Sequence, residues 1–118
     1  QTWPLMNNLY TPNDVNFSKI FNLLDFNNES LVQFYHRNIA YLICLIYVYI
    51  GSKVFLSKNT LLYKPYLYLL SIITLQVLLG ILTLISGVNI YLASLHQISS
   101  ILLVMFSLNL YHCSINNN

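Results

Sequence analysis

The sequence predicts an all-α integral membrane protein, in which an ordered extramembrane loop precedes three transmembrane helices. Hydrophobic residues make up 57% of the 118 residues and charged residues only 7%, against about 25% charged in ordinary globular domains. After Lys64 the chain contains no Asp, Glu, Lys or Arg. So few charges cannot cover the surface of a soluble fold, so lipid is the expected solvent for much of the chain.

Residues 1–30 form the predicted extramembrane loop. Pro4 and Pro12 break helices, and the many asparagines favour turns. The segment nevertheless carries too many large apolar side chains for a disordered tail. We therefore expect an ordered loop over the membrane surface, with a short amphipathic helix at Phe17–Leu24.

The first span is predicted at residues 31–52. Arg37 is the only charged residue between Leu31 and Gly51, and about 20 helical residues cross a hydrocarbon core of about 30 Å. Ser30 and Gln33 have the spacing of a capping box at the start of this helix.

A basic loop follows at residues 53–65. It carries Lys53, Lys58 and Lys64, and the positive-inside rule places such a loop in the cytoplasm or matrix. The N-terminal loop is therefore expected on the outer side and the C-terminus on the inner side. Pro65 suits the first turn of the next helix.

The second span, predicted at residues 66–86, carries a stripe of small and polar side chains. Gln76, Gly80, Thr83 and Gly87 are spaced four, three and four residues apart, which places them on one helical face. Such a stripe favours close approach of another helix or of a flat ligand.

The third span is predicted at residues 92–112, after a turn at 87–91, and a polar tail follows at 114–118. His36 lies about six residues into the first span and His96 about five into the third. Both spans are expected to begin on the outer side, so at about 1.5 Å per residue both histidines lie roughly 7–9 Å below their helix starts.

Two neutral imidazoles at one depth in an apolar bundle suit the axial positions of a haem iron. Arg37 can then pair with a haem propionate near the outer surface, while Gly80 and Thr83 allow the ring to approach the second span. In the alternative, His36 and His96 each hydrogen-bond a neighbouring helix.

Other sites are less well supported. Zinc lacks a third and fourth ligand near the two histidines. His112 stands about 24 Å further along the helix than His96 and is expected to be an interfacial side chain. Cys44 and Cys113 are expected to be free buried thiols.

Several function classes are excluded by what residues 31–113 lack. They contain no Asp or Glu, hence no carboxylate for proton abstraction. The chain has no Gly-rich phosphate loop, no Ser/His/Asp set and no basic aromatic stripe, and its net charge of +2 is too small to indicate a nucleic-acid partner. A reaction run here would rely on a cofactor.

Four stretches, in their order and spacing, resemble the C-terminal half of heme A synthase of the mitochondrial and alphaproteobacterial type. They are residues 2–6 (Thr-Trp-Pro-Leu-Met), 32–37 (Val-Gln-Phe-Tyr-His-Arg, followed by Ala40-Tyr41), 76–84 (Gln-Val-Leu-Leu-Gly-Ile-Leu-Thr-Leu) and 92–97 (Leu-Ala-Ser-Leu-His-Gln).

The resemblance implies a fold of eight transmembrane helices in two four-helix bundles, of which this chain carries the last three helices. In the family, the N-terminal half oxidises a methyl group of heme O to the formyl group of heme A, and the C-terminal half carries a heme b cofactor. Residues 31–113 would then be a haem-binding half-bundle with His36 and His96 as the axial ligands of heme b.

Gln33 indicates the cofactor half. The substrate half of the family has a glutamate three residues before its first histidine, where it can do acid–base chemistry, and glutamine cannot. Tyr35 departs from the family, which usually has Asp there, and removes a possible partner for Arg37.

Two functions stay open. The chain is expected to be the heme b half of a heme A synthase, an oxidoreductase that supports cytochrome c oxidase assembly, completed by the missing N-terminal half or another chain and inactive alone. Alternatively, it is a non-catalytic structural or assembly subunit of a respiratory membrane complex. A small bis-haem carrier ranks last, because only His112 is spare. The resemblance implies the mitochondrial inner membrane, or else a bacterial plasma membrane.

Overall fold

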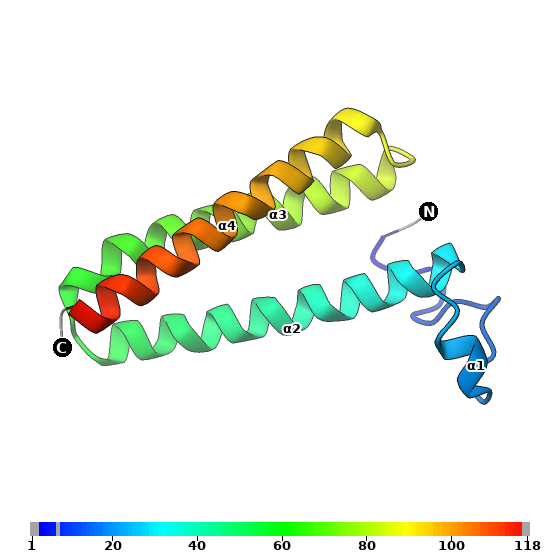
Figure 1. Ribbon diagram of the computed structural model, residues 1–118, viewed down its shortest axis with the longest axis horizontal. Helices are drawn as coiled ribbons and strands as arrows, with labels where there is room; N and C mark the ends of the chain where they lie inside the picture. The colour runs from blue at the N-terminus through cyan, green and yellow to red at the C-terminus, as the bar shows by residue number, and fades with distance from the viewer. Residues whose placement is uncertain (1–2, 7, 117–118) are drawn as a thin grey trace. The chain divides into compact units, whose positions relative to one another are not determined.

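The structure is a computed structural model that describes residues 3–6 and 8–116. Its regular elements are the helices α1 (Ile20–Leu23), α2 (Glu29–Leu56), η1 (Thr60–Leu62), α3 (Tyr63–Ile85) and α4 (Ile90–Asn116) (Figure 1). Thr2 of the first family stretch and the last two residues of the predicted tail lie outside the described residues.

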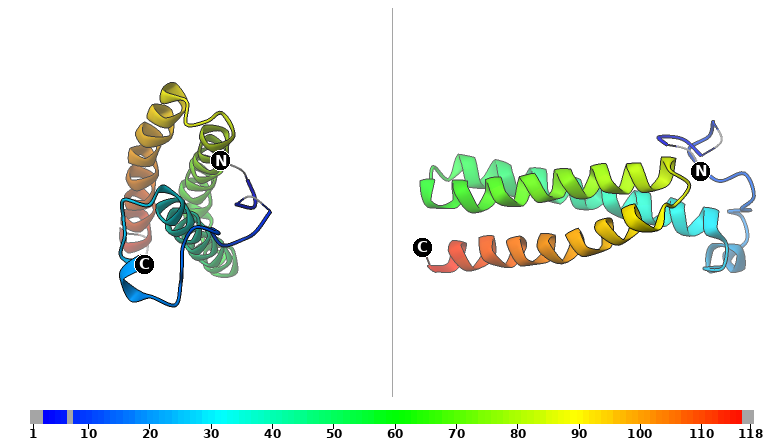
Figure 2. Two further views of the ribbon diagram at one scale, coloured as in Figure 1. Left: turned by 90° about the vertical axis from the view of Figure 1, so that its right-hand side faces the viewer. Right: turned by 90° about the horizontal axis from the view of Figure 1, so that it is seen from above.

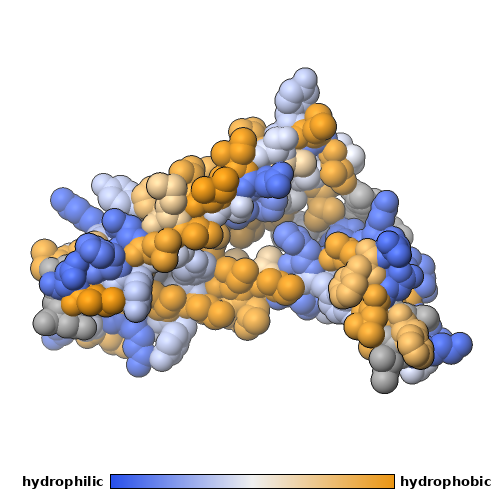
Figure 3. Space-filling model, viewed as in Figure 1, coloured by the Kyte–Doolittle hydropathy of each residue, from blue (hydrophilic) through white to orange (hydrophobic). Residues whose placement is uncertain are grey.

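Among the described residues, three helical segments are long and apolar enough to cross a membrane, namely Glu29–Leu56, Thr60–Ile85 and Ile90–Asn116. Only 11–17% of their most apolar windows is buried within the chain. Figure 3 shows apolar side chains along the visible face of these helices, with hydrophilic groups mostly nearer the helix ends. Because water does not cover so much apolar surface favourably, these segments are transmembrane helices, and the predicted all-α membrane fold with three spans is confirmed.

Each helix is longer than the span predicted for it. Helix α2 starts before residue 31 and continues past residue 52, and α4 continues through Asn116, into the predicted polar tail. Hydropathy marks the part of a helix that crosses hydrocarbon, whereas the backbone hydrogen bonds of a helix continue through polar residues outside it.

The start of α2 corrects one prediction. Ser30 does not cap the helix, because the helix already begins at Glu29. Asn28 is the capping residue instead, and its Oδ1 accepts a hydrogen bond from the N–H of Leu31 at 3.0 Å. Asparagine is among the best N-cap residues, and Glu29 in the first turn complements the helix dipole.

The predicted amphipathic helix at Phe17–Leu24 is also shorter in the structure, where only Ile20–Leu23 is helical. Asn16 explains the difference. Its Oδ1 accepts from the N–H of Ser18 at 3.0 Å, and such an Asx turn competes locally with helix formation.

The antiparallel helices α3 and α4 lie side by side and are joined by a tight turn (Figures 1 and 2). At the end of α3 the N–H of Val88 donates to the carbonyl of Thr83 at 2.9 Å, and the N–H of Gly87 donates to that of Leu84 at 3.2 Å. This pair of bonds is a Schellman motif, which needs a residue with positive φ at its C′ position, and Gly87 has a φ of +71°. Gly87 therefore makes the turn rather than extending the predicted stripe.

The chain divides into two compact units, residues 1–45 and 46–118, and each is described by itself. The core of the second unit is an apolar cluster from the C-terminal part of α2, from η1, α3 and α4. Its buried members are Val54, Leu62, Tyr66, Leu69, Ile72 and Leu110.

Two tyrosines connect the helices of this second unit. The hydroxyl of Tyr66 on α3 donates to the backbone carbonyl of Tyr47 on α2 at 3.1 Å. The hydroxyl of Tyr47 in turn lies 2.6 Å from Oγ of Ser107 on α4. These bonds give the apolar unit a defined register, since each polar group in an apolar surrounding needs its partner.

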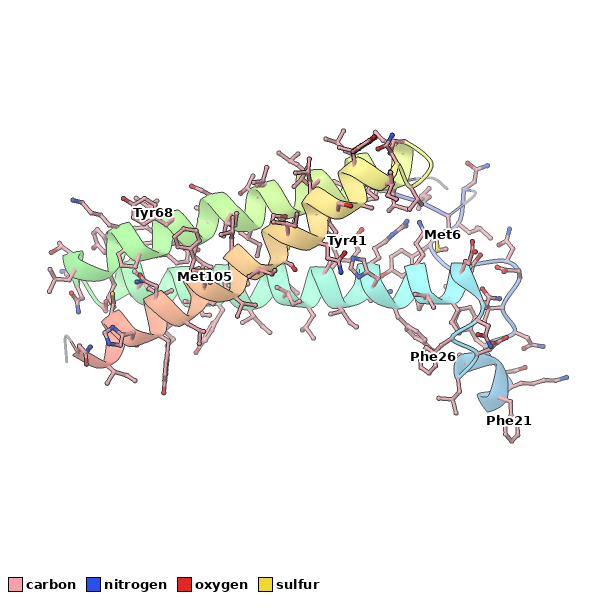
Figure 4. All side chains as sticks on the ribbon, turned by 45° about the horizontal axis from the view of Figure 1, so that its top comes forward. Met6, Phe21, Phe26, Tyr41, Tyr68 and Met105 are labelled. Atoms are coloured by element: carbon pink, nitrogen blue, oxygen red, sulfur yellow. The ribbon has the colours of Figure 1, made fainter. Side chains whose placement is uncertain are left out.

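In the first unit, aromatic side chains tie the N-terminal segment to α2. The rings of Tyr10 and Phe17 each meet the ring of Phe34 edge-on at 5.7 Å. The hydroxyl of Tyr35 donates to the carbonyl of Leu23 at 2.9 Å. Phe21 is 88% exposed and points away from α1 (Figure 4).

Candidate functional site

The six predicted site residues fall into two half-sites, one in each unit. Helix α2 carries three of them in the first unit, and α3 and α4 carry the other three in the second. The first group is Gln33, His36 and Arg37; the second is Gly80, Thr83 and His96.

His96 on α4 is oriented by the backbone of α3. Its Nδ1 lies 3.0 Å from the carbonyl oxygen of Gln76. A carbonyl oxygen only accepts, so Nδ1 must carry the proton, and in a neutral imidazole the lone pair then lies on Nε2. The ring is therefore held in the tautomer whose Nε2 can bind a metal.

Gly80 leaves room for this ring. A Cβ at position 80 would stand 3.1 Å from Cε1 of His96 and 3.5 Å from its Nδ1. Contacts that short are unfavourable, so a side chain at this position would press the imidazole away from α3. The predicted close approach at Gly80 is thus explained by a histidine ring lying against the glycine.

Gln76 and Ser99 complete the second half-site. The amide Nε2 of Gln76 donates to the backbone carbonyl of His96 at 3.0 Å. Ser99, only 5% exposed, donates its hydroxyl proton to Oε1 of Gln76 and lies 3.0 Å from the His96 carbonyl. The predicted site did not include Ser99, although its place three residues after His96 puts both on one helix face.

Thr83 is on the same helix as Gly80, one turn further on, and is half-buried. Its Oγ1 donates to the carbonyl of Leu79 at 2.7 Å, within α3. This bond satisfies the hydroxyl inside an apolar span, so the side chain presents its methyl group to its surroundings.

In the other half-site, His36 is an exposed residue of α2. Gln33, one turn before it, has a buried Nε2 with no hydrogen-bond partner among the described residues. A buried amide without a partner is costly, and here it is a donor on the same helical face as His36.

Arg37 lies on α2 directly after His36 but is only 6% exposed. Its Nη1 donates to the backbone carbonyl of Pro4. The guanidinium thereby holds the N-terminal segment against α2, a role that the sequence did not predict. Its pairing with a propionate stays a prediction.

The remaining candidates are peripheral. His112 is exposed, near the end of α4, with Nε2 2.9 Å from the amide nitrogen of Asn116. Cys44 and Cys113 are half-buried thiols, and Sγ of Cys113 lies 3.9 Å from Oδ1 of Asn109. Among the described residues, no three His, Cys, Asp or Glu side chains cluster as metal ligands.

The chain is similar to known proteins over most of its length. Residues 1–108 match the family described as cytochrome oxidase assembly protein, COX15-CtaA. The chain is 43% identical to the heme A synthase of Pelagibacter ubique (strain HTCC1062) over 103 residues, which cover 87% of this chain and 30% of that protein. It is 36% identical to the heme A synthase of Wolbachia pipientis wMel over 110 residues, covering 93% and 29% respectively.

A third relative, the heme A synthase of Rickettsia conorii (strain ATCC VR-613 / Malish 7), is 31% identical over 103 residues, covering 87% of this chain and 30% of its own. The chain thus spans about three tenths of the length of the curated relatives it matches. No solved structure matches it. The match over residues 1–108 confirms the family resemblance: this chain belongs to the COX15-CtaA family of cytochrome oxidase assembly proteins.

Proposed function

We propose that this chain is the heme b-binding C-terminal part of a heme A synthase and supports the oxidation of heme O to heme A. The observation that carries the proposal is the state of His96, with Nδ1 on the Gln76 carbonyl and the ring against Gly80. The relatives named heme A synthase support the same assignment.

The His96 half-site fits a haem iron by its donor chemistry. Histidines that bind metals almost always donate their other ring N–H to a carbonyl or carboxylate, which fixes the tautomer and raises the basicity of the ligating nitrogen. The carbonyl of Gln76 supplies that partner. The hydrogen bond to the neighbouring helix, weighed as an alternative to ligation, is thus part of the arrangement that ligation needs.

His36 is the proposed second axial ligand. It stands seven residues after Glu29, the first residue of α2, and His96 stands six after Ile90, the first of α4. At about 1.5 Å per residue, each imidazole is attached about 9–11 Å along its helix. In a chain with three spans, the first and the third begin on the same side of the membrane, so the two depths correspond.

Donors for the haem propionates lie beside His36. The buried amide of Gln33 gains a partner if it donates to a carboxylate. Arg37 has five N–H donors, so its bond to Pro4 is compatible with a second bond to a propionate. Gly80 serves this site by leaving room for the imidazole of His96, and Thr83 presents a small side chain where the porphyrin would approach α3.

Bound heme b would supply one-electron transfer. The residues of this chain orient the imidazoles, receive the propionates and exclude water by apolar spans. No residue of this chain is proposed to oxidise heme O, and that step is assigned to the N-terminal half that the family resemblance implies. The proposed partner is that N-terminal part, and the proposed role is in cytochrome c oxidase assembly.

We place the protein in the mitochondrial inner membrane or a bacterial plasma membrane. Lys53, Lys58 and Lys64 are exposed around η1, which by the positive-inside rule faces the matrix or cytoplasm. Residues 1–30 then lie in the intermembrane space or periplasm, and the C-terminus lies inside.

The test is the haem content of the full-length enzyme that contains this chain, purified in detergent, with haems extracted and identified by chromatography. Wild-type protein is expected to retain heme b, and His36→Ala and His96→Ala are each expected to lose it. His112→Ala is the matched control and is expected to keep it. Retention of heme b by both single variants would overturn the proposal.

Heme A content of the membranes separates the two functions. The proposed function predicts that His36→Ala and His96→Ala lower it. A non-catalytic subunit of a respiratory complex predicts unchanged heme A even when the whole chain is depleted.

A further inference from the structure

We infer that Gln76 is a positioning residue that sets the tautomer and the ring orientation of His96 by fastening α4 to α3. The inference rests on the proposed function in so far as His96 binds haem iron. The observation behind it is that the same two residues are joined twice, once through each backbone carbonyl.

The two bonds run in opposite directions. His96 donates from Nδ1 to the backbone carbonyl of Gln76 at 3.0 Å, and Gln76 donates from Nε2 to the backbone carbonyl of His96 at 3.0 Å. A single bond would leave α4 free to turn or slide relative to α3. Two bonds between different atoms of the same residues restrict both movements, so the imidazole meets the carbonyl in one position.

The backbone carbonyl of His96 fixes which end of the Gln76 amide faces it, because this oxygen accepts a hydrogen bond from Nε2. The hydroxyl of Ser99 donates to Oε1 at the other end of the amide. The opposite amide orientation would place two acceptor oxygens against each other, so the assignment follows from the donor and acceptor inventory. Because Ser99 is buried, water does not compete for this bond.

The apolar surroundings of α3 and α4 favour this set of hydrogen bonds. In an apolar span an unmade hydrogen bond is not replaced by one to water, so the amide, the hydroxyl and the ring nitrogen all favour this single arrangement. Gly80, one turn after Gln76 on α3, lets the imidazole lie close against the helix. Loss of the Gln76 side chain removes the second bond and lets the ring turn away from the carbonyl.

Loss of the Gln76 side chain has three measurable consequences. Without the bond from Nε2 of Gln76 to the His96 carbonyl, the proton of His96 is expected to redistribute from Nδ1 toward Nε2. The reason is that the ring no longer holds Nδ1 against the backbone carbonyl of residue 76. In the haem-loaded protein, the weaker N–H···O=C bond makes Nε2 less basic, which destabilises the ferric state and raises the reduction potential. Haem is expected to dissociate roughly tenfold faster, the lower end of the effect of removing such a partner.

The test compares Gln76→Leu with Gln97→Leu in the full-length enzyme. Both changes remove an amide near His96, but Gln97 is exposed. Nitrogen NMR of [15N]histidine-labelled protein, made in haem-deficient cells, reports the tautomer of His96, whose signal is identified by its loss in His96→Ala. Potentiometry and haem-transfer kinetics on loaded protein report the potential and the dissociation rate.

We expect Nδ1–H for His96 in wild-type protein and in Gln97→Leu, and a shift toward Nε2–H with a higher potential in Gln76→Leu. Ser99→Ala is a milder change that should shift the tautomer and the potential in the same direction. It replaces Gln76→Leu in the test if Gln76→Leu does not fold. An unchanged tautomer and potential in folded Gln76→Leu, or in Ser99→Ala if that variant alone folds, would overturn the inference. Because the tautomer is read without haem, absence of haem from wild-type protein would reject the proposed function and leave the positioning result standing.

Discussion

The imidazole of His96 lies against Gly80, so closely that a Cβ at position 80 would be 3.1 Å from its Cε1. The glycine and the histidine belong to different helices, α3 and α4. Their contact explains why a residue with a high cost in a helix interior stands in the middle of an apolar span.

Gly80→Ala is therefore expected to displace the ring by a few tenths of an ångström and to weaken its bond to the Gln76 carbonyl. Helix propensity favours alanine by about 1 kcal/mol, so the protein should stay folded while haem retention falls. Haem-to-protein ratios of purified full-length enzyme check this, with Val77→Ala, an exposed position on the same helix, as the control. Full retention in Gly80→Ala would show that the ring tolerates the methyl group.

Gly51 and Tyr66 make a second close contact, between α2 and α3 in the second unit. A Cβ on Gly51 would overlap the hydroxyl end of Tyr66, whose ring is buried and whose hydroxyl is bonded to Tyr47. Gly51→Ala is expected to destabilise the protein by about 1–3 kcal/mol, the usual cost of overpacking.

Combining Gly51→Ala with Tyr66→Leu measures the coupling of these two positions. The double variant should lose less than the sum of the two single losses, because the shorter side chain removes the overlap. Additive losses in a detergent unfolding titration would mean that the two residues do not meet.

Gly87 is required by its backbone rather than by packing. Its φ of +71° disfavours any residue with a Cβ, and nothing lies within 4 Å of a Cβ built there. Gly87→Ala is expected to cost about 1 kcal/mol, measured as a lower thermal midpoint. Gly87→Asn should cost less, since asparagine tolerates positive φ; equal losses would point to a different cause.

Variants at Arg37 and Asn38 separate anchoring of the N-terminal segment from haem binding. Arg37→Ala removes the bond to the Pro4 carbonyl and is expected to raise hydrogen exchange in residues 3–10. Asn38, the next residue, also holds this segment through the hydroxyl of Tyr10, so Asn38→Ala should raise exchange there without changing haem content. If Arg37→Ala lowers haem content while Asn38→Ala does not, Arg37 also serves a propionate.

The spans were predictable because hydropathy depends on composition, and few charges are enough to locate lipid-facing helices. The ends of the helices were less predictable from the sequence. Asn28 rather than Ser30 caps α2, because both residue types suit a cap and only the backbone path decides between them. The turn at residues 87–91 was predicted, but Gly87 was also counted in the stripe of the second span, since spacing alone does not show where a helix stops.

The candidate site likewise has features that the sequence predicts and features that it does not. His36 and His96 were predicted as site residues from their matching positions, and Gly80 from its place on the stripe. The hydrogen bonds of Gln76 with His96 and Ser99 depend on how α4 is rotated about its axis, which the sequence does not reveal because polar residues are spread around this helix. The burial of Arg37 was missed because it depends on where the loop before α2 returns, and loops carry little periodicity.

The most direct test is the electron paramagnetic resonance spectrum of the full-length ferric enzyme in its wild-type, His36→Ala and His96→Ala forms. The wild type should show a low-spin signal with two imidazole ligands, and each single variant should lose that signal through haem loss or conversion to high spin, while His112→Ala keeps it. An unchanged bis-imidazole signal in either His36→Ala or His96→Ala would contradict the assignment of the axial ligands.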